Sequence, residues 1–293
     1  MEKRKGPIRI AIQVVVFVAL FYGMASVLDY VLGWLAGDLA GRTFAVLCAT
    51  LLASWLTLRI FEGIPVREVG LWWSRDSMDN LGLGLAGGAG AACLALTPPL
   101  LTGAARIVCN RSPDYSTFVF ALICVAAGSI GEELLFHGYG FQLLMASLGP
   151  WATILPVGVI FGWMHAANPG ASTMGLIDTA GFGILFGYAY LRSRDLWLPI
   201  GLHVGWNVLL PLFGADLSGF RIFREASGYE LVWRAGALWS GGNYGPEASL
   251  LTSAALIPLF VYLWKAPIRR QFSPLTDRPA EDPPCEPAPQ SES

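Results

Sequence analysis

The most informative segment of the chain is Gly131-Glu132-Glu133-Leu134-Leu135-Phe136-His137-Gly138. It lies inside an apolar run from about residue 115 to residue 148, so its two adjacent carboxylates fall where charges are poorly tolerated. One charged side chain at the centre of a bilayer costs on the order of 2.5–3.5 kcal/mol on insertion scales. Membrane proteins keep such residues mainly where they function or pair across a helix bundle. We therefore expect the rest of the chain to supply partners for Glu132 and Glu133.

The composition indicates a membrane protein. Of the 293 residues, 54% are hydrophobic and 14% are charged, whereas a soluble domain carries about 25% charged residues. Long continuous apolar runs do not fit a β-barrel, whose segments alternate over about 10 residues, and a backbone that faces lipid must be helical. The sequence therefore predicts an all-α polytopic protein embedded in the lipid bilayer. The formal net charge of −2 shows no excess of basic residues that could bind nucleic acid, so no such partner is expected.

Eight apolar runs predict about eight transmembrane helices. Their approximate ranges are 10–34, 44–61, 81–104, 115–148, 151–167, 173–191, 196–213 and 248–264. The fourth run is longer than the ~20 residues that a bilayer requires, so we expect it to tilt or to break near Gly128. The connections between the fourth and seventh runs are short, which predicts that these four helices pack as neighbours.

The ends of the predicted spans suggest an orientation. Lys and Arg are more frequent on the side of the first residues than on the opposite side, so both termini are predicted to be cytoplasmic. Short connections and the lack of targeting signals favour the plasma membrane of a prokaryote. Residues 271–293 carry a net negative charge and six prolines between Pro274 and Pro289, a composition that predicts a disordered tail.

The chain contains only three histidines, and all of them fall in the fourth to seventh runs. His137 follows Glu133 by four residues, and positions four apart share one face of a helix. The same spacing relates His203 to Asn207. His165 lies in the fifth run, between these two pairs. Because adjacent residues on a helix are about 100° apart, the two glutamates cannot have the same surroundings.

These residue types can hydrolyse an amide without a nucleophilic side chain. A carboxylate shielded from bulk water can act as a general base, and a neighbouring histidine can share the same water. A second histidine and an amide can donate hydrogen bonds to the oxyanion that develops in acyl transfer. A metal is the competing use of these side chains. The possible Zn²⁺ ligands, which would leave an open position for water, are Glu133, His137, His165 and His203.

Three ordered motifs resemble those of the CAAX-protease and bacteriocin-processing family of intramembrane endopeptidases. The first family motif is a Glu-Glu pair followed, after three residues, by Arg. The second is Phe-x-x-x-His, and the third is His-x-x-x-Asn/Asp. The matching positions are Glu132-Glu133 with His137, Phe161 with His165, and His203 with Asn207. Any one of these motifs alone would be weak evidence, whereas three in order are specific.

The resemblance implies an intramembrane endopeptidase that cleaves membrane-associated protein or peptide substrates. It implies that Glu132 and His165 activate the water, that His203 and Asn207 hold the oxyanion, and that Glu133 supports them. Members of the family have been described as metalloproteases and also as glutamate enzymes that need no metal. The implied protease domain comprises residues 1–270, with its motif core at 115–213, and residues 271–293 follow as the tail.

His137 departs from the family pattern. Arginine keeps its charge, whereas histidine can be neutral, donate a hydrogen bond or ligate a metal. His137 is therefore given only a supporting role, and its presence makes a Zn²⁺ site easier to envisage. The substitution also keeps open a catalytically silent scaffold or immunity protein with the same fold. Since intramembrane carboxylates and histidines also relay protons, a proton-coupled carrier is the other alternative.

Overall fold

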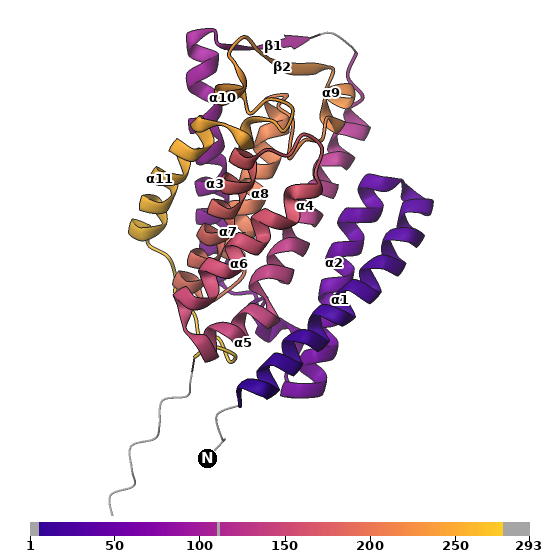
Figure 1. Cartoon of the computed structure of the whole chain (residues 1–293), viewed down its shortest axis with the longest axis vertical. Coiled ribbons are helices and arrows are strands. Elements are labelled where there is room, and N and C mark those ends of the chain that lie inside the picture. The colour runs from indigo at the N-terminus through magenta and orange to yellow at the C-terminus, as the bar shows by residue number, and fades with distance from the viewer. Residues whose placement is uncertain (1–5, 110–111, 278–293) are drawn as a thin grey trace, which may run out of the picture.

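The computed structural model describes residues 6–109 and 112–277, which form a bundle of helices (Figure 1). Within these described residues, six helical segments are long and apolar enough to cross a membrane, which confirms an all-α polytopic membrane protein. They are Pro7–Ala36, Asp38–Glu62, Arg75–Thr102, Tyr115–Leu148, Pro150–Ala167 and Thr173–Ser193. Two shorter apolar helices, Trp197–Leu212 and Leu250–Lys265, coincide with the last two predicted spans. A count of eight spans stays a prediction.

The chain runs back and forth between two ends of the bundle (Figure 1). The helices are α1 (Pro7–Ala36), α2 (Asp38–Thr57), α3 (Arg75–Thr102), α4 (Tyr115–His137), α5 (Tyr139–Leu148), α6 (Pro150–Met164), α7 (Thr173–Ser193), α8 (Trp197–Leu212), α9 (Ile222–Ser227), α10 (Ala237–Ser240) and α11 (Leu250–Lys265). Single turns are η1 (Leu58–Glu62), η2 (Val66–Val69), η3 (His165–Ala167) and η4 (Pro246–Ala248). Both described termini lie at one end, which we call the terminal end.

The fourth predicted span breaks at Gly138 rather than near Gly128. The helix continues through Gly128 and ends as α4 at His137, after which α5 takes a new direction along the terminal end (Figure 1). A Cβ atom on Gly138 would lie 2.1 Å from the carbonyl oxygen of Leu134, so only glycine permits this turn. The break places the motif residues in the last two turns of α4.

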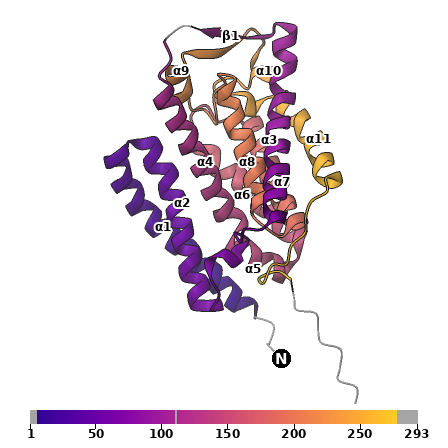
Figure 2. The same cartoon turned by 180° about the vertical axis from the view of Figure 1, so that it is seen from behind.

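Glycines bring α3 and α8 into direct backbone contact. A Cβ atom on Gly88 would lie 2.0 Å from the carbonyl oxygen of Leu202, and one on Gly84 would lie 2.4 Å from that of Leu198. Figure 2 shows the two helices side by side. Small residues allow such close approach. In lipid, where the hydrophobic effect does not drive helices together, the resulting van der Waals packing stabilises their association. This packing fixes α8, which carries two of the predicted site residues.

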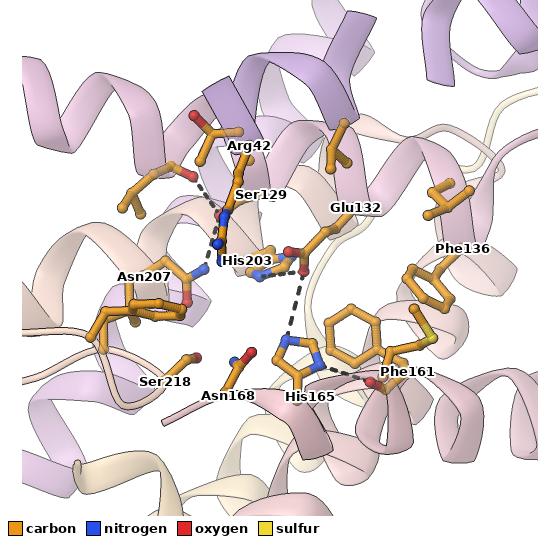
Figure 3. Close-up of a pocket in the computed structure, with 18 of the residues that line it drawn as sticks. Arg42, Ser129, Glu132, Phe136, Phe161, His165, Asn168, His203, Asn207 and Ser218 are labelled. Carbon is orange, nitrogen blue, oxygen red and sulfur yellow. Dashed lines mark hydrogen bonds and ion pairs between the residues drawn. The ribbon is translucent and has the colours of Figure 1, made fainter. Parts of the chain in front are cut away.

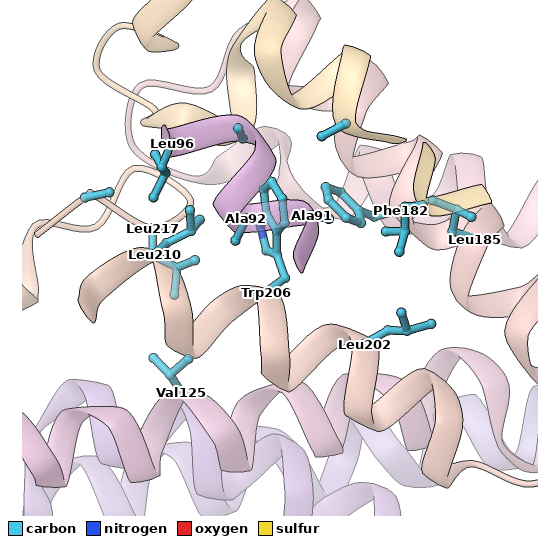
Figure 4. Packing of buried hydrophobic residues seen from close by; sticks show 14 of the residues in the cluster. Ala91, Ala92, Leu96, Val125, Phe182, Leu185, Leu202, Trp206, Leu210 and Leu217 are labelled. Carbon is cyan, nitrogen blue, oxygen red and sulfur yellow. The ribbon is translucent and has the colours of Figure 1, made fainter. Parts of the chain in front are cut away.

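Large apolar side chains fill the space between α8 and its other neighbours. Trp206 of α8 is buried against Phe182 of α7, with ring centroids 4.6 Å apart. Figure 4 shows Trp206 in this cluster, to which Leu202, Leu210 and Leu217 also belong. Close packing of this kind holds α8 in one rotational setting about its own axis.

A cap covers the end of the bundle opposite the termini. It consists of residues 214–249, and its strand β2 (Tyr229–Trp233) pairs antiparallel with β1 (Ala105–Cys109) (Figure 1). Gly219 of the cap donates a backbone hydrogen bond to Tyr244 at the other side of the same segment. The segment that sequence analysis treats as a long polar loop is therefore a folded unit.

The first residues of the predicted disordered tail, 271–277, are ordered in the structure. The backbone N–H of Gln271 bonds to the carbonyl of Ser193, and the buried hydroxyl of Ser273 lies 3.0 Å from that of Tyr190. Residues 271–277 are therefore packed on the terminal end of the bundle. The remaining tail residues, 278–293, lie outside the described residues.

The contact between α3 and α8 predicts that Gly88→Ala lowers stability. The added methyl group must push the two backbones apart, and overpacking of this kind costs about 1–3 kcal/mol. Thermal unfolding of the purified protein in one detergent measures the effect. Gly90→Ala on the same helix is the control, because nothing lies within 4 Å of its Cβ position. Equal unfolding midpoints for the two variants would contradict the packing.

Candidate active site

The predicted site residues come together around one cavity of about 740 Å³ (Figure 3). Glu132 lies on α4, His165 at the end of α6, and both His203 and Asn207 on α8. All four line the cavity. The remaining walls are mostly apolar and come from α1, α2, α7 and the cap. Three segments that are distant in sequence thus present their polar side chains to one cavity.

Glu133 does not line this cavity but lies behind it, fully buried between two histidines. One carboxylate oxygen, Oε2, is 2.8 Å from Nδ1 of His137, and the other, Oε1, is 2.8 Å from Nδ1 of His203. A buried carboxylate is costly unless its oxygens accept hydrogen bonds. Both oxygens are satisfied here, so Glu133 joins α4 to α8 and fixes the ring of His203.

Glu132 faces the opposite way, into the cavity. Its Oε2 atom lies 3.9 Å from Nε2 of His203 and 4.0 Å from Nε2 of His165. These distances are too long for direct hydrogen bonds, but they suit a water molecule that bridges the groups. The Glu132 side chain is 33% exposed, in contrast to the buried Glu133. The step of one residue along α4 therefore separates a structural carboxylate from an accessible one.

Hydrogen bonds at the far nitrogens set the orientation of the two histidines that line the cavity. Nδ1 of His165 lies 2.8 Å from the carbonyl oxygen of Phe161, which can only accept, so this nitrogen donates. Nδ1 of His203 likewise donates to the Glu133 carboxylate. In both rings the other nitrogen, Nε2, is then left to face Glu132. The Phe161 position of the second motif thus orients His165 through its backbone.

Asn207 is held by a residue that sequence analysis missed. Its Nδ2 atom donates to the hydroxyl of Ser129 at 3.0 Å, and Ser129 in turn donates to the carbonyl of Val125. Ser129 lies four residues before Glu133 and so shares its helix face, a signal that periodicity alone could have revealed. The amide group retains a second hydrogen that is free to meet a ligand.

The second missed residue is Glu247, a buried carboxylate of the cap that also lines the cavity. It falls in a stretch that the sequence presents only as polar loop. Nothing in its spacing connects it to the three motifs, because the cap brings it over the cavity through tertiary folding.

The four residues considered as Zn²⁺ ligands are not gathered at one point. The histidines His137 and His203 already occupy both oxygens of Glu133, and His165 is paired with Glu132 instead. Nε2 of His137 is buried and has no hydrogen-bond partner, so this ring turns away from the cavity residues. Within residues 6–109 and 112–277, no group of three or more His, Cys, Asp or Glu side chains has an arrangement that could hold a metal ion. The arrangement therefore does not fit the zinc site that sequence analysis left open as the competing use of Glu133, His137, His165 and His203.

The hydrogen bond between His137 and Glu133 predicts how substitutions of His137 affect stability. His137→Asn keeps a donor near the position of Nδ1, whereas His137→Leu leaves one buried carboxylate oxygen without a partner. We expect the leucine variant to be less stable than the asparagine variant by about 1–3 kcal/mol. Thermal unfolding of the two purified variants measures the difference, and equal stability would show that the hydrogen bond is dispensable.

Comparison with known proteins agrees with the motifs. Residues 114–209 match the family model described as "Type II CAAX prenyl endopeptidase Rce1-like". The matched segment runs from the residue that caps α4 into α8 and includes every predicted site residue. No curated protein and no solved structure matches the chain. The resemblance drawn from the three motifs is confirmed for this segment, since residues 114–209 match the model of the Rce1-like family of type II CAAX prenyl endopeptidases.

Proposed function

We propose that this protein is an intramembrane endopeptidase that hydrolyses peptide bonds of membrane-associated proteins or peptides. The observation that carries the proposal is the convergence of Glu132, His165 and His203 on one cavity within the segment that matches a protease family. We assign the protease domain to residues 1–270, organised around residues 115–213. The cavity is large enough for several side chains of an extended peptide, in keeping with pockets of about 300–1,000 Å³ that bind ligands.

In the proposed mechanism, Glu132 is the general base. A water molecule between Glu132 and Nε2 of His165 gives its proton to the carboxylate while its oxygen attacks the carbonyl carbon of the scissile bond. The proton then passes from Glu132 to the leaving amine as the carbon–nitrogen bond breaks. A base that is positioned in this way contributes roughly 10²- to 10⁴-fold to a rate.

The oxyanion is stabilised from α8. Nδ1 of His203 already donates to Glu133, so a second hydrogen bond from Nε2 requires the ring to carry a positive charge. The buried Glu133 carboxylate favours that charged ring, as a carboxylate does for the histidine of a serine protease. The free hydrogen of the Asn207 amide is the second donor. Removal of one such donor typically lowers kcat by about 10²- to 10³-fold.

We also propose that both termini are cytoplasmic, in the plasma membrane of a prokaryote. At the terminal end the described basic residues are Arg9, Arg59, Arg67, Arg75, Arg192, Arg194, Lys265, Arg269 and Arg270. Those at the opposite end are Arg42, Arg106, Arg221, Arg224 and Arg234. This bias supports the orientation, and the short connections of the chain support a prokaryotic source. The cap and the cavity beneath it then face away from the cytoplasm.

The proposed function predicts that Glu132→Gln abolishes cleavage. The amide keeps the shape of the carboxylate but cannot accept the proton, so we expect a loss of at least about 100-fold. The measurement compares peptide termini in membranes that contain equal amounts of the wild type or the variant. Glu68→Gln, in η2 at the terminal end, is the control and should retain the wild-type pattern.

Two outcomes of that comparison are informative. Cleaved termini that are found with the wild type and with Glu68→Gln, but not with Glu132→Gln, identify substrates and support the base. Identical termini for folded wild type and Glu132→Gln would contradict proteolysis through this residue.

A separate prediction concerns metal ions. If Glu132 acts as base without a metal, chelation of Zn²⁺ should change the cleavage rate of the purified protein less than about twofold, because no step depends on a Lewis acid. The measurement is the rate before and after dialysis against a strong chelator, together with elemental analysis of the protein. Loss of cleavage that Zn²⁺ alone restores would overturn the metal-free mechanism.

A further inference from the structure

The mechanism does not use Glu247, although this residue lines the same cavity as Glu132. It lies in η4 of the cap, beyond residues 114–209 that match the family model. Only 8% of the residue is exposed. A carboxylate that is removed from water in this way needs donors or a counter-ion.

Two hydrogen bonds hold Glu247 in place. Its Oε2 atom accepts from the backbone N–H of Ser218, and its Oε1 atom accepts from the hydroxyl of the same residue at 3.2 Å. A carboxylate offers about four acceptor positions, so lone pairs remain. Within the described part of the chain, Glu247 forms no ion pair with lysine, arginine or histidine. The carboxylate is thus rigidly oriented but lacks a cation.

Burial raises the pKa of the Glu247 carboxyl above its ordinary value. The hydrogen bonds from Ser218 act in the opposite direction, as does the nearby His165, but the desolvation is larger. A positive charge brought into the cavity would offset that desolvation. The protein itself does not provide such a charge within ion-pair distance of Glu247.

A second feature of the same place is a donor that acts on Glu247. The indole N–H of Trp206 is buried and interacts with the Glu247 carboxylate, whose charged form it favours. Trp206 lines the cavity together with Phe220 and Phe223 of the cap. The indole N–H is thus a further donor, beside those of Ser218, that favours a charged carboxylate at this place.

The cavity as a whole favours a positive ligand. Four carboxylates line it, against the guanidinium of Arg42 and the His203 ring that is charged in the proposed mechanism. The carboxylates belong to Asp29, Asp38, Glu132 and Glu247. Like charges in a cleft with apolar walls focus the field and attract ligands of the opposite sign. The indole of Trp206 beside Glu247 and the other aromatic rings that line the cavity would cover the aliphatic part of a long basic side chain and interact with its cationic end.

We propose that Glu247 forms a subsite for a lysine or arginine side chain of the peptide substrate. This subsite rests on the proposed endopeptidase activity and specifies its substrate class: an apolar segment with a basic residue near the scissile bond. The alternative is that Glu247 only fastens the cap through Ser218.

The test uses synthetic peptides copied from a sequence whose cleavage the comparison of termini has identified. Each position within four residues of the scissile bond carries Lys, Gln or Glu in otherwise identical peptides. Cleavage is measured with purified wild type and with Glu247→Gln, whose amide can still accept from and donate to Ser218. Asp216→Asn is the matched control, because it breaks the ion pair of Asp216 with Arg224 in the same cap without changing a residue that lines the cavity.

The expected result is that, at one position, the wild type cleaves the Lys peptide with a kcat/KM at least about tenfold above that of the Gln peptide. The difference should lie mainly in KM, and the Glu peptide should be the poorest. In Glu247→Gln this ratio should fall to about one, whereas Asp216→Asn should retain it.

Other outcomes overturn the proposal in distinguishable ways. If the wild type cleaves the three peptides equally and Glu132→Gln cleaves none, the endopeptidase function stands and the basic subsite is wrong. A preference for Lys that survives in Glu247→Gln would leave Glu247 as a fastener of the cap only. If the wild type cleaves none of the peptides, the proposed function and the subsite fall together.

Discussion

The arrangement of the site depends on one buried carboxylate, that of Glu133, held between two histidines. Because His137 and His203 satisfy both oxygens, α4 and α8 are joined at a fixed height and rotation. The neighbouring Glu132 therefore faces the cavity, where its carboxylate lies 4.0 Å from Nε2 of His165 and 3.9 Å from Nε2 of His203. Loss of either hydrogen bond to Glu133 would lower stability and displace both the proposed base, Glu132, and the proposed oxyanion donor, His203.

The helices can reach this arrangement because glycines line their contacts. Gly88 sets α8 against α3, and Gly131 sets α4 against α2, where a Cβ atom would lie 2.8 Å from the backbone nitrogen of Leu47. Gly138 then ends α4 directly after the last motif residue of that helix. In lipid, where apolar burial does not drive helices together, such close contacts supply much of the packing energy. The glycine content of the chain thus serves the geometry of the site.

The spacing of apolar and polar residues predicts the features of the structure that arise within a single helix. The apolar runs predict the helical fold. The spacing of residues along the helices predicts the pairing of Glu133 with His137 and the match to the family model. The break at Gly138 and the packing of residues 271–277 depend on contacts between distant segments, so the pattern does not contain them. Glu247 is the clearest such case, since the cap carries it to a cavity built by other helices.

The most direct test of the account separates the two glutamates. Purified Glu132→Gln and Glu133→Gln would be compared with the wild type for thermal unfolding and for single-turnover cleavage of one identified substrate. We expect Glu132→Gln to unfold at the wild-type temperature but not to cleave, whereas Glu133→Gln should unfold at a lower temperature and also cleave more slowly. A Glu132→Gln protein that cleaves at the wild-type rate, or a Glu133→Gln protein of unchanged stability, would contradict this expectation.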